Sequence, residues 1–270
     1  MDKVIGFIGT GNMGAAIIKG LLDTGFASPG NIVASRRNQL ALDKLKSESG
    51  IQTTSNNTLV ASKADILFIA VKPNVYESII EEVRTFIKAD AVIVNIAAGK
   101  SIHFIEDTFQ KPVKVARAMP NTPALVGEGM IGICFNEEME KTEREYIVEL
   151  FSSIGKVEVV AESLLDAVVG VSGSSPAILY MIIEAMADGA VKSGMPRQQA
   201  YTFAAQAMLG SAKMVLETGI HPGELKDQVC SPGGTTIEAV TKAEETGLRS
   251  SILAAVEAAV TKSVEMTKES

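Results

Sequence analysis

The chain has 270 residues, of which 46% are apolar, 21% are charged and 23 are glycine; it contains no tryptophan. At about 150 residues per domain this predicts one large or two moderate domains with a real core, and it excludes a disordered or collagen-like chain. The formal net charge of −7 disfavours nucleic acid and anionic lipid as partners, so any anion that the protein binds has to be held by a local site.

Three features of the sequence indicate a cytoplasmic protein. The first residues, Met1 to Val4, lack the basic start of a secretion signal. No continuous apolar run approaches the roughly 18 residues of a membrane span. Cys134 and Cys230 are far apart, so we expect neither a disulfide nor a metal centre in a reducing compartment.

Short apolar runs alternate with helical patterns over the first part of the chain. The runs are typical of strands buried on both faces of a parallel sheet. They occupy residues 4–8, 31–34, 66–71, 91–96, 113–116, 130–135 and 157–160. Strand–helix alternation predicts a doubly wound α/β domain over residues 1–161.

After residue 161 the strand signal stops, and residues 162–270 are predicted to form an all-helical domain. Helical patterns cover residues 176–192, 197–218, 236–246 and 248–268. The first of these has apolar residues around most of its circumference, including Ile178, Leu179, Met181 and Ile182. Such a helix needs burial on more than one side, so we expect the tail to pack against a second copy of the chain.

A glycine-rich turn, Gly9-Thr10-Gly11-Asn12-Met13-Gly14, joins the first strand to the first helix. In this position the glycines allow a tight turn and the close approach of a pyrophosphate, which the helix N-terminus then faces. A turn that only reverses the chain is the alternative. The strand before it and the helix after it favour a dinucleotide site of the Rossmann type.

The end of the second strand indicates which dinucleotide binds. An NAD site favours an acidic residue about 20 residues past the glycines, but this chain has Ser35, Arg36 and Arg37 there. A hydroxyl and two guanidinium groups suit the 2′-phosphate of NADP(H). We therefore expect NADPH, with NADH possible; a solvated basic turn is the alternative.

Three further turns follow predicted strands, where open α/β sheets bind ligands. Ala70-Val71-Lys72-Pro73 and Ala97-Ala98-Gly99 have small residues that admit a ribose and a nicotinamide, or that simply pack. Met119-Pro120-Asn121-Thr122-Pro123 is equally open to a structural interpretation.

A loop in the helical tail, Ser231-Pro232-Gly233-Gly234-Thr235-Thr236, has the composition of an anion site in front of a helix. It could hold a substrate carboxylate through backbone N–H groups, or it could be an ordinary capped loop. Other chemistries have little support: His103 and His221 are the only histidines, and both are interpreted as surface or capping residues. Cys230, Tyr180 and Lys192 have no spacing that marks them as reactive.

Together these motifs resemble the pyrroline-5-carboxylate reductase family. The resemblance rests on residues 7–14, 70–73, 97–99, 119–123, 173–177 and 231–236, which occur in the family's order. The Ser-Pro-Gly-Gly-Thr-Thr loop is the most specific of them, because general Rossmann proteins lack it. The resemblance covers essentially the whole chain.

The resemblance implies reduction of the C=N bond of 1-pyrroline-5-carboxylate to L-proline by NADPH or NADH. It implies a helical dimerisation domain and homodimers that assemble further, for example to a decamer. Cofactor-lining residues carried over by position are Ile8, Gly9, Thr10, Gly11, Asn12, Met13, Ser35, Asn57, Ala70, Val71, Lys72, Pro73, Ala97, Ala98 and Gly99. Because Asn56 lies beside Asn57, either asparagine could match the family's cofactor position.

The resemblance also implies the substrate contacts. Backbone groups of Ser231, Gly233, Gly234, Thr235 and Thr236 would hold the carboxylate, and the Thr236 hydroxyl would bind the ring nitrogen. A protonated imine is already electrophilic, so proximity and orientation are the main requirements. Two alternative functions remain. One is a β-hydroxyacid dehydrogenase, but those enzymes usually have a lysine and an asparagine one helical turn apart, and no asparagine follows Lys192 at that spacing. The other is a protein that binds the cofactor without turnover.

Overall fold

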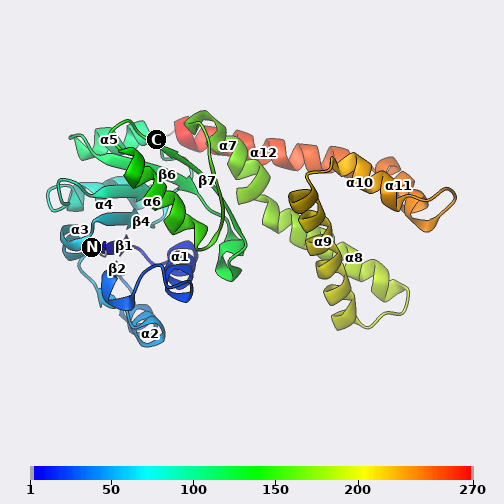
Figure 1. Cartoon of the computed structure of the whole chain (residues 1–270), viewed down its shortest axis with the longest axis horizontal. Helices are drawn as coiled ribbons and strands as arrows, with labels where there is room; N and C mark the ends of the chain where they lie inside the picture. The colour runs from blue at the N-terminus through cyan, green and yellow to red at the C-terminus, as the bar shows by residue number, and fades with distance from the viewer. Residues whose placement is uncertain (1–2, 269–270) are drawn as a thin grey trace. The chain divides into compact units, whose positions relative to one another are not determined.

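The computed structural model describes residues 3–268, which form two compact units. The first unit extends to Ser174 and also includes the end of the chain from Ala258; the second comprises Ser175–Glu257. Figure 1 labels the elements of both. The division into two domains after residue 161, which the sequence predicts, does not coincide with the bounds of these two units. It stays a prediction.

The first unit is built on one eight-stranded sheet in the order β3-β2-β1-β4-β5-β6-β7-β8. All neighbouring strands are parallel except β6 and β7, which are antiparallel. The strands are β1 Ile5–Ile8, β2 Ile32–Ser35, β3 Gln52–Thr54, β4 Ile66–Ile69, β5 Val92–Asn95, β6 Lys114–Met119, β7 Gly129–Phe135 and β8 Gly155–Val159. The seven predicted strands are confirmed within a few residues.

Two features of the sheet differ from the sequence-based expectation. The short edge strand β3 was not predicted, because its residues Gln52, Thr53 and Thr54 are polar and partly exposed and give no apolar run. The sheet is not wholly parallel, because only residues 120–128, which include the turn Thr122–Val126, separate β6 from β7. A parallel crossover needs a dozen or more residues, so a connection this short returns the chain in the opposite direction.

Helices cover both faces of the sheet, which confirms the doubly wound α/β class. They are α1 Asn12–Asp23, α2 Gln39–Ser49, α3 Asn57–Lys63, α4 Tyr76–Val83, α5 Ile102–Phe109, α6 Lys141–Ser152 and the short α7 Leu165–Val168. One apolar core includes Ile17 of α1 and Phe151 of α6. The other includes Val60 of α3, Ile80 of α4 and Ile105 of α5. Strands β1, β2, β4 and β5 between these cores are buried on both sides, as their continuous apolar runs predict.

The second unit is helical, as predicted. Its helices are α8 Ser175–Lys192, α9 Arg197–Thr218, α10 Pro222–Val229, α11 Thr235–Glu245 and the first part of α12 Leu248–Lys268. Helices α8 and α9 pack against each other (Figure 1). Within this single chain, α8 buries only Pro176 and Ala187 among its residues. The large side chains that it leaves exposed include Leu179, Met181 and Met186.

One helical run in the described part of the chain, Glu162–Lys192, is long and apolar enough to cross a membrane by length and composition alone. This finding does not overturn the sequence-based expectation, which concerned continuous apolar runs. The run contains acidic residues, so it is not a continuous apolar stretch, but its best 18-residue window has a mean hydropathy of 1.4. Only 11% of that window is buried inside the chain.

Candidate active site

The glycine-rich turn between β1 and α1 is a bare backbone loop. Gly9 has a φ of +89°, and a Cβ there would lie 2.6 Å from the carbonyl oxygen of Ala70, so only glycine fits without strain. Gly11 caps α1 without a side chain, and a Cβ on it would meet no atom within 4 Å. The first N–H groups of α1 have no acceptor within the helix and border this open space.

The same loop contains a polar atom without a partner. Thr10 is 4% exposed, and its buried hydroxyl has no hydrogen-bond partner. A buried polar group without a partner is rare and requires an explanation. A bare glycine turn, a free helix N-terminus and a spare hydroxyl together fit a dinucleotide diphosphate, because phosphate oxygens accept from such donors.

The end of β2 lies beside this turn. Gly9 N–H donates to the Ser35 carbonyl at 2.9 Å, and Arg36 Nη1 donates to the Thr10 carbonyl at 3.0 Å. Arg36 and Arg37 are both exposed. The structure thus places Arg36 against the glycine turn, which a solvated basic turn would not require.

The structure separates the roles of Asn56 and Asn57. Asn57 Oδ1 accepts from the Ser35 hydroxyl at 2.7 Å, and its Nδ2 donates to Glu82 Oε2 at 2.9 Å. Asn56 instead caps α3, because its Oδ1 accepts from the N–H groups of Thr58 and Leu59. Asn57 is therefore the residue that lies beside Ser35, and its place in the cofactor site stays a prediction.

The remaining cofactor candidates follow the next two strands. Ala70 to Pro73 follow β4, and Ala97 to Gly99 follow β5. Because β2, β1, β4 and β5 are parallel neighbours, all these segments lie along one edge of the sheet. The strand order reverses between β1 and β4, and α/β sheets bind ligands at such a switch point.

The turn after β6 has a structural role. Asn121 is 7% exposed; its Nδ2 donates to the Ser172 carbonyl at 2.9 Å, and its Oδ1 accepts from Met130 N–H at 2.9 Å. The Ser172 carbonyl lies in a π-helical turn, Val169–Gly173. Asn121 thus joins β7 to this turn.

The Ser231–Thr236 loop belongs to the second unit, between α10 and α11. Gly233 has a φ of +67°, and Gly234 N–H donates to the Ser231 carbonyl at 3.0 Å. Gly234 caps α11, and no side chain accepts from the first N–H groups of this helix. These N–H groups can therefore donate hydrogen bonds to an anion. Thr236 is half-buried in the first turn of this helix.

The other titratable candidates do not form a reactive site. His103 is exposed beside Asp107, and Nδ1 of His221 accepts from Gly223 N–H as a cap, as the sequence predicts. Burial raises the pKa of the Cys134 thiol to about 12, which keeps it protonated. Among residues 3–268 there is no group of three His, Cys, Asp or Glu side chains that could hold a metal ion.

The fold and the glycine-lined edge define a Rossmann-type dinucleotide-binding protein. Residues 4–99 match the family described as NADP oxidoreductase coenzyme F420-dependent. Residues 162–266 match the family described as pyrroline-5-carboxylate reductase dimerisation.

Full-length relatives narrow the class further. The pyrroline-5-carboxylate reductase of Escherichia coli K12 is 47% identical over 99% of this chain and 100% of its own length. The chain belongs to the pyrroline-5-carboxylate reductase family.

Solved structures agree with this membership. The reductase structure from Coxiella burnetii has a TM-score of 0.91 and 33% identity, and covers 99% of both chains. The Plasmodium falciparum pyrroline carboxylate reductase with NADP bound has a TM-score of 0.90 and 29% identity, and covers 98% of both chains.

Proposed function

We propose that the chain reduces the C=N bond of 1-pyrroline-5-carboxylate to L-proline, the last step of proline biosynthesis, with NADPH and with NADH as a possible substitute. The observation that carries this function is full-length similarity to pyrroline-5-carboxylate reductases. The NADP-bound relative supports the choice of cofactor.

The cofactor is assigned to the edge of the sheet in the first unit. The turn Ile8 to Met13 fits the diphosphate, and Ser35, Arg36 and Arg37 fit the 2′-phosphate, with Asn57 beside them. Ala70 to Pro73 and Ala97 to Gly99 complete the lining. When bound, the reduced nicotinamide supplies the hydride.

The substrate carboxylate is assigned to the loop at the start of α11. Backbone groups of Ser231, Gly233, Gly234, Thr235 and Thr236 hold it without a buried arginine, as the free helix N-terminus supports. The Thr236 hydroxyl orients the ring nitrogen. A protonated imine needs no strong base, and orientation supplies much of the acceleration.

The chain works with a second copy of itself. Its dimerisation region supports a homodimer, and we propose that dimers assemble further, to a decamer, in the cytoplasm. The exposed apolar residues of the helical unit support this arrangement. Neither nucleic acid nor a membrane is proposed as a partner.

The activity is tested by following NADPH oxidation with 1-pyrroline-5-carboxylate, with 3-hydroxy and 2-hydroxy acids as controls in the oxidative direction. Turnover with the imine alone supports the proposal. Folded protein that binds NADPH without imine-dependent turnover would refute it and favour a cofactor-binding protein without catalysis. Preferential oxidation of a hydroxy acid would favour a β-hydroxyacid dehydrogenase instead.

Two variants test the residue assignments. Replacing Arg36 and Arg37 with alanine should weaken NADPH far more than NADH, since only NADPH has the 2′-phosphate. Thr236→Ala should lower kcat/KM for the imine by about tenfold or more, the size of a lost hydrogen bond to a charged group. An unchanged kcat/KM would remove Thr236 from the site.

A further inference from the structure

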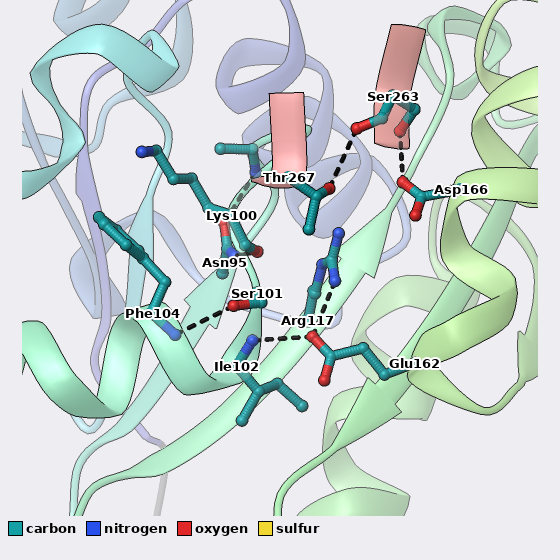
Figure 2. A network of polar contacts seen from close by, with 11 residues as sticks. Asn95, Lys100, Ser101, Ile102, Phe104, Arg117, Glu162, Asp166, Ser263 and Thr267 are labelled. Atoms are coloured by element: carbon teal, nitrogen blue, oxygen red, sulfur yellow. Dashed lines mark hydrogen bonds and ion pairs between the residues drawn. The ribbon is translucent and has the colours of Figure 1, made fainter. Parts of the chain in front are cut away.

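The segment Ala97–Gly99, assigned to the cofactor, is held from its inner side by one buried side chain. Asn95 is the last residue of β5 and is 0% exposed. Its Oδ1 accepts from Ala97 N–H at 2.8 Å, and its Nδ2 donates to the Lys100 carbonyl at 2.7 Å. A single carboxamide thus binds both ends of the turn (Figure 2).

The outer side of the turn is closed by the end of α12, which belongs to the same unit. Gly99 has a φ of +76°, and a Cβ there would lie 2.8 Å from Met266 Cβ and 3.1 Å from its carbonyl carbon. The Ser263 hydroxyl donates to Asp166 Oδ1 at 2.5 Å, which joins α12 to α7 (Figure 2). The turn therefore has little room to move outward.

Glu162 holds the first residue of α5, Ile102, a few residues beyond the turn. Its Oε1 accepts from Ile102 N–H at 2.8 Å and from Arg117 Nη1 at 2.7 Å (Figure 2). Arg117 pairs with Asn95 in the register of β5 and β6, and its side chain is buried. The Ala97–Gly99 turn is consequently restrained at its start, at its end and on its outer side.

We propose that Asn95 is a positioning residue for this reductase: it holds the backbone of Ala97–Gly99 in the shape that lines the cofactor. Asn95 is the only polar residue in the run 91–96, and a buried carboxamide is costly unless it is fully bonded. Its two bonds both go to the backbone of this turn. A turn that is already ordered loses less conformational entropy when a ligand binds.

This inference rests on the proposed function, so its test measures cofactor binding as well as activity. Asn95→Asp keeps the shape and the acceptor for Ala97 N–H, but it removes the donor to the Lys100 carbonyl. The Kd for NADPH, measured by fluorescence on the dimer, should rise about tenfold or more, because the donor is lost and a buried oxygen then faces the Lys100 carbonyl oxygen. The KM for the imine should stay within about twofold, because that substrate is assigned to a different loop.

Asn136→Asp is the matched control. Asn136 is also buried, and its carboxamide bonds to Val115 N–H, the Val113 carbonyl and Glu106, away from the turn. It should lower the Tm without changing the Kd for NADPH. Equal Kd values for wild type and Asn95→Asp, or equal Kd increases in both variants, would overturn the proposal.

Hydrogen exchange tests the wild-type chain directly and does not depend on whether a variant folds. The amides of Ala97 and Ile102 should exchange slowly, since each donates to a side chain that the turn itself does not contain. Exchange of the Ala97 amide at the rate of an unstructured peptide would overturn the proposal, because that amide donates to Asn95 Oδ1. Failure of the imine assay alone would leave these binding and exchange results intact, and would count against the proposed function only.

Discussion

The two compact units bury their apolar residues to very different degrees. In the sheet unit, all residues of β1, β2, β4 and β5 are buried, and Phe7 stacks on Phe68 with ring centroids 4.6 Å apart. In the helical unit, α9 buries only Ala200 and Ala204. Large side chains such as Phe203 and Leu209 stay exposed in the single chain.

This difference shows which part of the fold is complete within one chain. The sheet has helices on both faces, so its strands are removed from water without a partner. Each fully buried large apolar side chain contributes roughly 1.5–3 kcal/mol, and α8 and α9 gain little of this alone. The dimerisation region therefore depends on a second copy for burial that the sheet unit finds within itself.

The largest expected effect comes from a charge on the helical unit. Phe203→Glu should dissociate the dimer and abolish most activity, because burying an unpaired carboxylate costs several kcal/mol. Light scattering after size exclusion measures the mass. Phe86→Glu is the matched control, since Phe86 is an exposed phenylalanine of the sheet unit, and it should leave the dimer intact. If both variants remain dimeric, the dependence of the helical unit on a second copy is contradicted.

Substitutions of two glycines in the sheet unit distinguish an effect on stability from an effect on cofactor binding. Gly9→Ala should lower stability by about 2 kcal/mol or more, because its left-handed φ and the Ala70 carbonyl both oppose a Cβ. Gly11→Ala should lower the Tm much less, since its Cβ meets no atom and only the N-cap preference of glycine over alanine is lost, yet weaken NADPH by at least about tenfold by filling the space for the diphosphate. Thermal unfolding and NADPH titration measure the two effects; equal Tm losses would contradict the placement of Gly11.

Burial of Cys134 predicts a loss of stability at alkaline pH. Burial raises the pKa of its thiol from the ordinary 9.0 to about 12, so between these values the unfolded chain releases a proton that the folded chain keeps. Stability is thus full below pH 9 and falls as pH rises. The loss amounts to about 2 kcal/mol at pH 10.5.

Urea unfolding at pH 8.0 and 10.5 measures this loss. Cys134→Ser does not titrate in this range, so it should lose about 2 kcal/mol less than wild type over the same interval. Equal losses in the two proteins would show that the Cys134 thiol ionises alike in the folded and unfolded chains.

The smallest expected effect distinguishes two adjacent asparagines. Asn56→Ala should cost about 1 kcal/mol of stability by removing the cap of α3, with no change in NADPH affinity. Asn57→Ala should instead weaken NADPH, because it removes the partner of the Ser35 hydroxyl. Thermal unfolding and NADPH titration of both variants give the comparison, and a weaker NADPH affinity in Asn56→Ala would reverse the assignment.

Local patterns predicted much of the fold. The apolar runs of β1 and β4, the glycine turn and helices such as α9, with bounds at Arg197 and Thr218, follow from residue periodicity and backbone preference. The helix α10 is not predicted because four of its eight residues, Pro222–Val229, are polar and the others form no apolar period. Short polar elements carry no periodic signal that distinguishes them from loops.

The sequence by itself determined the dinucleotide motif, the strand ends that are proposed to line the cofactor, the helical tail and the family resemblance, because these depend on residues that are close together in the chain or on motif order. Only the tertiary structure decided that β7 runs antiparallel, that Asn57 meets Ser35, and that Asn95 and Met266 restrain the Ala97–Gly99 turn. Met266 and Gly99 are far apart in the chain, and contacts between distant residues are created only when the strands and helices pack together.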